Sequence, residues 1–111
     1  MIADSYTPPN FKAKDEALQF AQGIVAQSKL IAECSPLMLD VANKKLKPWD
    51  GSAGTAKFLT VKAVDASASD VANVPLYKSG SINASAIKWP DGTTETDKLV
   101  AFVGSPISVF V

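Results

Sequence analysis

The chain has 111 residues, which fits one small domain, and its 11 lysines are balanced by 11 acidic residues. Without a basic surplus, and with no arginine to form a bidentate fork on phosphate or guanine, the composition excludes a general electrostatic binder of nucleic acid. Histidine is absent, and the single cysteine, Cys34, has no internal disulfide partner. We interpret Cys34 as a small apolar filler in a protein made in a reducing compartment.

The sequence contains no residue set that indicates catalysis. Asp40, Asp50, Asp65 and Asp91 each stand at a predicted turn or strand end, where turn chemistry explains a carboxylate. Lysine is the only base present that could activate a hydroxyl nucleophile, and the glycines form no phosphate loop. We therefore predict a protein that is not an enzyme and that holds no cofactor and no metal.

No apolar run reaches the roughly 18 residues that a membrane-spanning helix needs. The first residues carry neither a basic flank nor an apolar core, so we expect no signal peptide and synthesis in the cytoplasm.

Residues 1–14 are interpreted as an extended arm. Pro8 and Pro9 favour polyproline geometry, and Tyr6 and Phe11 are apolar anchors in a segment that has little else to bury. Such aromatic residues are unusual in a freely flexible tail, which predicts that the arm packs on its own fold or on a partner.

The segment that follows the arm is ambiguous. Residues 15–22 begin with two acids and carry an apolar stripe, which favours a short helix that ends at Gly23. Residues 24–32 predict a strand interrupted near Gln27, although a helix continuing through Glu33 remains the alternative.

A hairpin over residues 36–51 is the clearest supersecondary unit. Leu37 and Leu39 recur with the period of two that a half-buried strand shows. A turn around Asn43 leads to a return strand, which must end or lie at a sheet edge at Pro48 because proline cannot donate to the ladder.

The clearest single strand is predicted for residues 57–64, because one of its faces is wholly apolar. That face consists of Leu59, Val61 and Ala63. A polar loop over residues 65–73, with room for one helical turn, separates it from a short strand over residues 74–78, which Ser79-Gly80 is expected to close.

The carboxyl-terminal part predicts two short helices and a strand. Asn83 is a candidate cap for a one-turn helix. A second helix is predicted within residues 93–102, with Thr94 as the N-cap and Asp97 completing an approximate capping box. Residues 105–111 alternate in polarity and predict a terminal strand tied into a sheet.

Together these segments predict an α+β fold that is mostly β: a compact small domain of short strands with one or two short helices and an extended N-terminal arm. We divide the chain into an arm, residues 1–22, and a body, residues 23–111. Six apolar residues are expected to pack in the core or between subunits: Leu37, Leu39, Trp49, Tyr77, Trp89 and Phe102.

Seven short fragments follow one another in a characteristic order. They are Pro36-Leu37-Met38-Leu39-Asp40, Lys45-Leu46, Trp49-Asp50-Gly51, Tyr77-Lys78-Ser79-Gly80, Trp89-Pro90, Ala101-Phe102-Val103-Gly104 and Ile107-Ser108. In this order and spacing the chain resembles the head decoration proteins of lambda-like tailed phages over about residues 34–109. Upstream of Cys34 the chain is more apolar than the Pro/Gly/Ala-rich arm of that family, and the resemblance ends.

The resemblance implies a β-tadpole-like fold and a non-enzymatic homotrimer. Such trimers cap the threefold and quasi-threefold positions on the outside of the expanded phage head and stabilise the capsid against packaged DNA. The partners implied are the major capsid (coat) protein and further copies of the chain, with no nucleic acid and no membrane. By analogy residues 1–22 are the capsid-binding arm, in which Tyr6, Pro8, Pro9 and Phe11 are the candidate coat contacts.

Two other interpretations stay open. A small glycan-binding or adhesion module would use Trp49 or Trp89 as a stacking platform and predicts an exposed tryptophan. A structural component of the phage tail would place the protein elsewhere in the virion, with no copies on the head.

Overall fold

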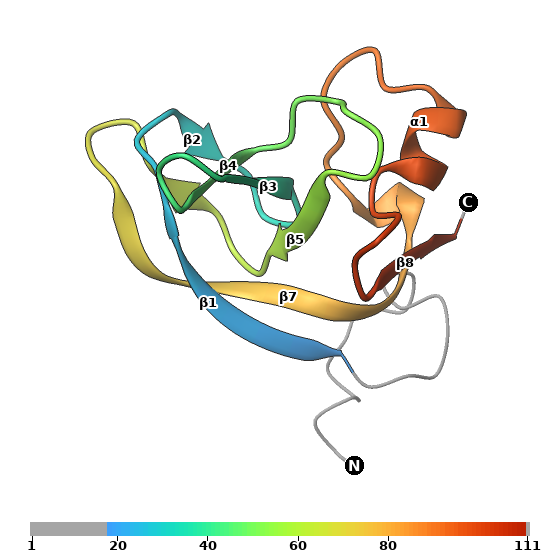
Figure 1. Ribbon diagram of the computed structural model, residues 1–111, viewed down its shortest axis with the longest axis horizontal. Coiled ribbons are helices and arrows are strands. Elements are labelled where there is room, and N and C mark those ends of the chain that lie inside the picture. Colours follow the sequence, from blue (N-terminus) through green and yellow to red (C-terminus); the bar gives the residue numbers. More distant parts are fainter. Residues whose placement is uncertain (1–17, 111) are drawn as a thin grey trace.

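The computed structural model describes residues 18–110, which form a compact, mostly β domain with one short α-helix (Figure 1). This architecture confirms the mostly β small domain that the sequence predicts, and the arm before residue 18 lies outside the described residues. The elements in chain order are β1 (Gln19–Val25), β2 (Leu30–Ile31), β3 (Pro36–Asp40), β4 (Lys45–Pro48), β5 (Ala56–Thr60), β6 (Val64–Asp65), β7 (Val71–Asn83), the 3-10 helix η2 (Ala84–Ala86), α1 (Glu95–Val100) and β8 (Ile107–Phe110).

Five strands close into a barrel-like sheet in the order β1-β4-β3-β5-β7, and β1 pairs with β7 to complete the circuit. The 13-residue β7 makes this closure possible, because it pairs with β1 and β5 and then, at its far end, with β8 in parallel (Figure 1). Closure leaves few unpaired strand edges to aggregate. The β8 pairing confirms that the predicted carboxyl-terminal strand is tied into a sheet.

The β3–β4 hairpin is confirmed. Its register places Leu37 opposite Pro48 and Asp40 opposite Lys45, and Pro48 is the last residue of β4. The Asp40 carboxylate organises the turn, because it accepts hydrogen bonds from the backbone N–H of Ala42 (3.2 Å) and from the side-chain amide of Asn43 (2.9 Å).

The helix considered for residues 15–22 is wrong over residues 19–22, which belong to β1. Gly23 does not end this element. It lies inside the strand, where a Cβ would stand 2.9 Å from Leu46 Cδ1, so that the Leu46 side chain would have to shift to accept one. The predicted interruption near Gln27 is confirmed, since β1 ends at Val25 and β2 begins at Leu30, and the alternative helix through Glu33 is wrong. The boundary drawn between residues 22 and 23 falls inside β1.

The strand predicted for residues 57–64 is divided. β5 ends at Thr60, and a turn separates it from β6, so the supposed apolar face is not continuous and Ala63 is exposed. Thr60 explains the break. Its hydroxyl is fully buried, donates to the carbonyl of Ala32 (2.9 Å) and accepts from the backbone N–H of Ser35 (2.9 Å), which ties the chain to another loop instead of to a longer ladder.

Conversely, the strand predicted for residues 74–78 is much longer. Ser79-Gly80 does not close it, and β7 continues through both residues, with Gly80 at φ 130°. Gly80 packs directly against Leu18, where a Cβ would stand 2.4 Å from a methyl carbon. The segment between β6 and β7 forms a loop around the Asp65 carboxylate, not a helical turn.

Both predicted helices are present in shortened form. η2 follows Asn83, whose side chain makes no capping hydrogen bond to it. α1 begins after Thr94 with a complete capping box: the Thr94 hydroxyl accepts from the Asp97 N–H (3.1 Å), and the Asp97 carboxylate accepts from the Thr94 N–H (3.2 Å).

Replacing Thr94 with alanine is expected to lower the free energy of unfolding by about 0.5–2 kcal/mol, because α1 buries none of its residues and depends on its cap. Urea unfolding followed by tryptophan fluorescence measures the loss. Thr96→Ala, on the exposed face of the same helix, is the matched control and should change stability much less. Equal losses in the two variants would contradict this role of the cap.

The core consists of two clusters that lie on either side of β3, β5 and β7. One fills the barrel: Val25, Ile31, Leu37, Leu46, Val64, Ala66, Val74 and Leu76. The other lies under η2, α1 and β8: Cys34, Trp49, Ala56, Leu59, Ile82, Ile87, Ala101, Phe102 and Ile107. With both faces of these strands covered, the sheet is a rigid base for the loops and helix around it.

Candidate functional site

The six residues predicted to pack in the core or between subunits separate into two groups. Leu37, Trp49 and Phe102 are at most 3% exposed and lie in the core, and Tyr77 and Trp89 are half-buried against the second cluster. Leu39, by contrast, is 45% exposed, although it lies on the same strand as Leu37.

The two tryptophans form an internal aromatic cluster. The Trp89 ring meets Trp49 edge-on at 5.7 Å and Phe102 at 6.4 Å between centroids. The Trp49 indole N–H donates to the carbonyl of Ser52 (2.9 Å), and that of Trp89 donates to the carbonyl of Ala84 (2.9 Å). Trp49, at 3% exposure, is not available as a stacking platform for a sugar.

Cys34 is buried in the same cluster and adopts the left-handed conformation, with φ 58°. Burial raises the pKa of the thiol from 9.0 to about 12; the nearby Glu33 carboxylate adds to this rise and Lys88 opposes it. The thiol therefore stays protonated and unreactive in the folded protein, as expected for a structural cysteine.

Cys34 is accordingly expected to react with a disulfide reagent at pH 8 only when the chain is unfolded.

Because the pKa of Cys34 is higher in the folded state than in the unfolded state, the folded state keeps the proton to higher pH. The stability that Cys34 contributes is therefore lost as the pH rises from about 9 to about 12. Denaturant melts across this range, with Cys34→Ala as the reference, measure the effect. A steep pH dependence shared by both proteins would instead assign it to other groups, such as the lysines.

The arm residues predicted to contact a coat protein, Tyr6, Pro8, Pro9 and Phe11, lie outside the described residues. The described chain begins just before β1, where Leu18 packs on Gly80 and Gln19 pairs with Ser79 of β7. The first described residues therefore pack on β7, the longest strand of the barrel.

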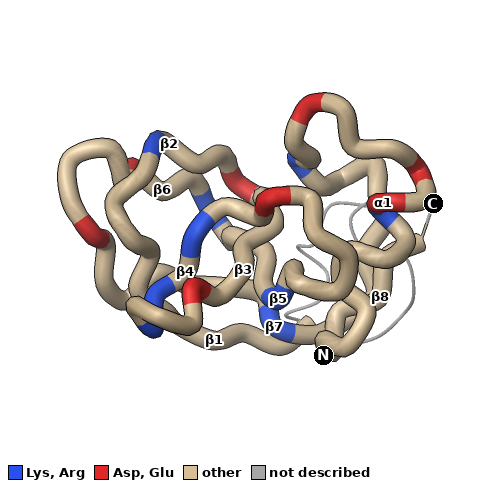
Figure 2. Tube along the Cα trace, turned by 45° about the horizontal axis from the view of Figure 1, so that its top comes forward, with Lys and Arg blue, Asp and Glu red and all other residues tan. Residues whose placement is uncertain are grey.

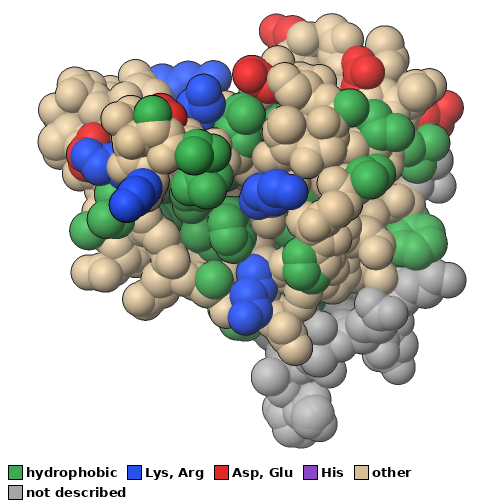
Figure 3. Space-filling model, in the orientation of Figure 1, with side chains coloured by type: hydrophobic (Ala, Val, Ile, Leu, Met, Phe, Trp, Pro, Cys, Tyr) green, Lys and Arg blue, Asp and Glu red, His purple; other side chains and the backbone are tan. Residues whose placement is uncertain are grey.

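A groove of about 520 Å³ opens beside this point and is named here the lysine-flanked groove. Apolar surface dominates it, and its lining contains two lysines and no acidic residue. Figure 3 shows apolar side chains gathered over the barrel strands, with lysines among them. The lining residues are Gln19, Leu39, Lys57, Phe58, Lys78, Ser79, Gly104, Ser105 and Pro106.

A second exposed surface runs along α1 and the turn after it. Glu95, Leu99 and Val103 are spaced by four residues and are all exposed, Leu99 by 48% and Val103 by 61%. We name these three residues the α1 strip. α1 carries two acidic residues in its first turn and Lys98 in its last, and Figure 2 shows both charges there, whereas the lysines that line the groove belong to β5 and β7.

Neither surface was predicted from the sequence. The four-residue spacing of Glu95, Leu99 and Val103 could have indicated an exposed helical strip. Because Phe102 was expected to pack in the core or between subunits, the apolar residues around it were not separated into buried and exposed ones. The groove has no local signal, because its residues come from β1, β3, β5, β7 and the turn before β8.

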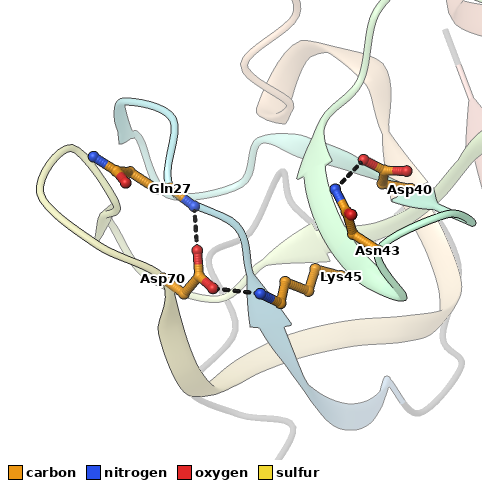
Figure 4. A network of polar contacts seen from close by, with 5 residues as sticks. All are labelled: Gln27, Asp40, Asn43, Lys45 and Asp70. Carbon is orange, nitrogen blue, oxygen red and sulfur yellow. Dashed lines mark hydrogen bonds and ion pairs between the residues drawn. The ribbon is translucent and has the colours of Figure 1, made fainter.

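A polar network braces the opposite end of the barrel (Figure 4). Asp70 accepts hydrogen bonds from the backbone N–H of Gln27 (2.8 Å) and from the ammonium of Lys45 (2.6 Å), which ties the loop before β7 to the end of β1 and to β4. These bonds hold the pKa of the Asp70 carboxyl below its usual value. The arrangement stabilises a loop and presents no nucleophile or acid–base pair.

Within residues 18–110, no group of three or more acidic, cysteine or histidine side chains could hold a metal ion. The helices of this part of the chain are too short and too polar to cross a bilayer.

Comparison with known proteins identifies the relatives of this chain. It is 38% identical over 77 residues to the putative decoration protein of Escherichia phage N15, which covers 68% of this chain and 67% of that protein. It is 40% identical over 75 residues to the head decoration protein of Enterobacteria phage P21, which covers 67% of this chain and 63% of that protein. The chain thus matches about two thirds of the length of each relative.

The family described as bacteriophage lambda head decoration protein D matches residues 19–108. This range confirms the resemblance and extends it upstream, because the match begins with β1 and not near Cys34. The prediction that the resemblance ends upstream of Cys34 was therefore wrong. The chain belongs to the family of the bacteriophage lambda head decoration protein D.

Proposed function

We propose that this chain is a capsid decoration protein that binds as a homotrimer to the outside of the expanded phage head. The trimers occupy threefold and quasi-threefold positions and stabilise the shell against the pressure of packaged DNA. The match to the head decoration family over residues 19–108, which spans every described strand but the end of β8, is the observation that carries the proposal.

In this proposal the N-terminal arm, residues 1–22, binds the major capsid protein by adding a strand to one of its sheets. Tyr6, Pro8, Pro9 and Phe11 are the proposed anchors. A strand added in this way makes several backbone hydrogen bonds, each worth about 0.5–1.5 kcal/mol net, and ordering the arm offsets much of that gain.

One arm therefore binds weakly, and the trimer supplies the affinity. Three arms on one particle act at high effective concentration, which raises the apparent affinity by about 10²–10⁴ when the three sites match in geometry. A protein that binds only the expanded lattice also stabilises that lattice by its differential affinity for it. No catalytic residue is needed for this role.

The proposal is tested by mixing purified protein with expanded, undecorated heads and with unexpanded shells of the same phage, followed by pelleting and counting bound copies. Saturable binding to expanded heads alone, in multiples of three, is the expected result. Equal binding to both shells would contradict the dependence on expansion. Binding to tails or to glycan, with none to heads, would overturn the proposal in favour of the other two functions.

A further inference from the structure

We propose that the lysine-flanked groove of one copy receives the α1 strip of a second copy, and that this head-to-tail contact closes the trimer. The inference rests on the homotrimer of the proposed function and assigns residues to its interface.

The first observation is the exposed apolar surface of the groove. Leu39, which lines the groove, keeps 45% of its surface exposed. Phe58 lies beside Leu39 in the groove and is half-buried. Single exposed apolar residues are ordinary, but a hollow lined mostly by apolar surface and bordered by charge is typical of a protein interface.

The second observation is that the groove and the α1 strip carry unpaired charges of opposite sign. Within residues 18–110 the ion pair is Lys45–Asp70, so Lys57, Lys78 and Glu95 have no oppositely charged partner there. Lys57 makes only a long hydrogen bond, 3.4 Å, to the carbonyl of Gly54. Pairing these charges across an interface breaks no existing ion pair. Their positions also fix how the two surfaces are oriented relative to each other.

The third argument is the symmetry of the contact. If the groove met the groove of another copy about a twofold axis, four lysines would be brought together and would repel one another. If the groove instead meets the α1 strip, Leu99 and Val103 cover the apolar lining while Glu95 approaches Lys57 and Lys78. A contact between two different surfaces of the same chain repeats from copy to copy and closes into a ring when the rotation per copy is 120°.

The test is a charge reversal and its rescue in the full chain. Sedimentation equilibrium measures the trimer association constant of the wild type, of Glu95→Lys, of Lys78→Glu and of the double variant. Each single reversal is expected to weaken every contact about tenfold, and so to lower the constant about 10³-fold for three contacts. The double variant restores the attraction and is expected to return to within about tenfold of the wild type.

Matched controls are Glu33→Lys and Lys62→Glu, which make the same changes at exposed positions outside both surfaces and should leave association unchanged. Wild-type association in both single variants, or no recovery in the double variant, would show that this contact does not form. Either result would contradict the interface and not the proposed homotrimer. A wild-type chain that stays monomeric would contradict the proposed trimer itself. If the single reversals abolish head binding while trimers persist, the groove binds coat protein instead, and the inference is wrong.

Discussion

Replacing Leu37 with alanine is expected to lower the free energy of unfolding by about 2–5 kcal/mol. Leu37 is fully buried in the barrel, opposite Pro48 of β4 and Phe58 of β5, so both neighbouring strands hold their positions and the cavity cannot readily collapse. A loss of this size is a large part of the 5–15 kcal/mol that stabilises a typical domain. Urea unfolding monitored by circular dichroism measures it.

The matched control is Leu39→Ala, two residues along the same strand. Leu39 is 45% exposed, so its removal should cost less than about 1 kcal/mol of folding free energy. Because association also stabilises the folded state, both variants are compared at several protein concentrations, so that folding and association are separated. A cost for Leu39→Ala equal to that of Leu37→Ala at every concentration would contradict the observed burial.

Deleting residues 1–14 is expected to abolish decoration of expanded heads and to leave a folded, soluble trimer. The deletion removes the proposed anchors Tyr6, Pro8, Pro9 and Phe11 and stops short of β1, which begins at Gln19. The deletion removes the three strand contacts of each trimer and therefore also the avidity that they provide together. The affinity for expanded heads should fall at least about 100-fold. Pelleting with expanded heads measures binding, and sedimentation measures the trimer.

Deletion of residues 1–5 alone is the control, because it keeps all four anchors and is expected to keep most of the binding. Replacing both Tyr6 and Phe11 with alanine should reproduce the loss caused by the longer deletion without shortening the arm. Unimpaired decoration by the protein that lacks residues 1–14 would show that the arm is not needed to bind the coat and that the rest of the chain makes the contact.

The elements that could be predicted from the sequence are those held by neighbours in the chain. The β3–β4 hairpin was predicted because alternation, turn residues and Pro48 all act within 16 residues. The N-terminus of α1 was predicted because the capping box joins Thr94 to Asp97, three residues away. The terminal strand β8 was visible in its own alternation, although its parallel partner was not.

The elements that were misjudged depend on distant partners. β1 looked helical before Gly23 and is a strand because it pairs with β7, some fifty residues later along the chain. β5 was predicted to run too far because nothing local shows that Thr60 bonds to Ala32 and Ser35. β7 was predicted to be too short because Ser79-Gly80 reads as a turn, whereas the packing of Leu18 on Gly80 holds the glycine within a long strand.

The sequence by itself determined the mostly β class, the hairpin, the capped helix and the family, because each depends on residues close together in the chain or on short motifs in a fixed order. Only the tertiary structure decided which residues of those motifs are buried. Leu37 and Leu39 have the same period and chemistry, yet one is enclosed by the barrel and the other lies at the edge of a groove. Burial depends on the closure of β1 on β7, and no local pattern determines where distant strands meet.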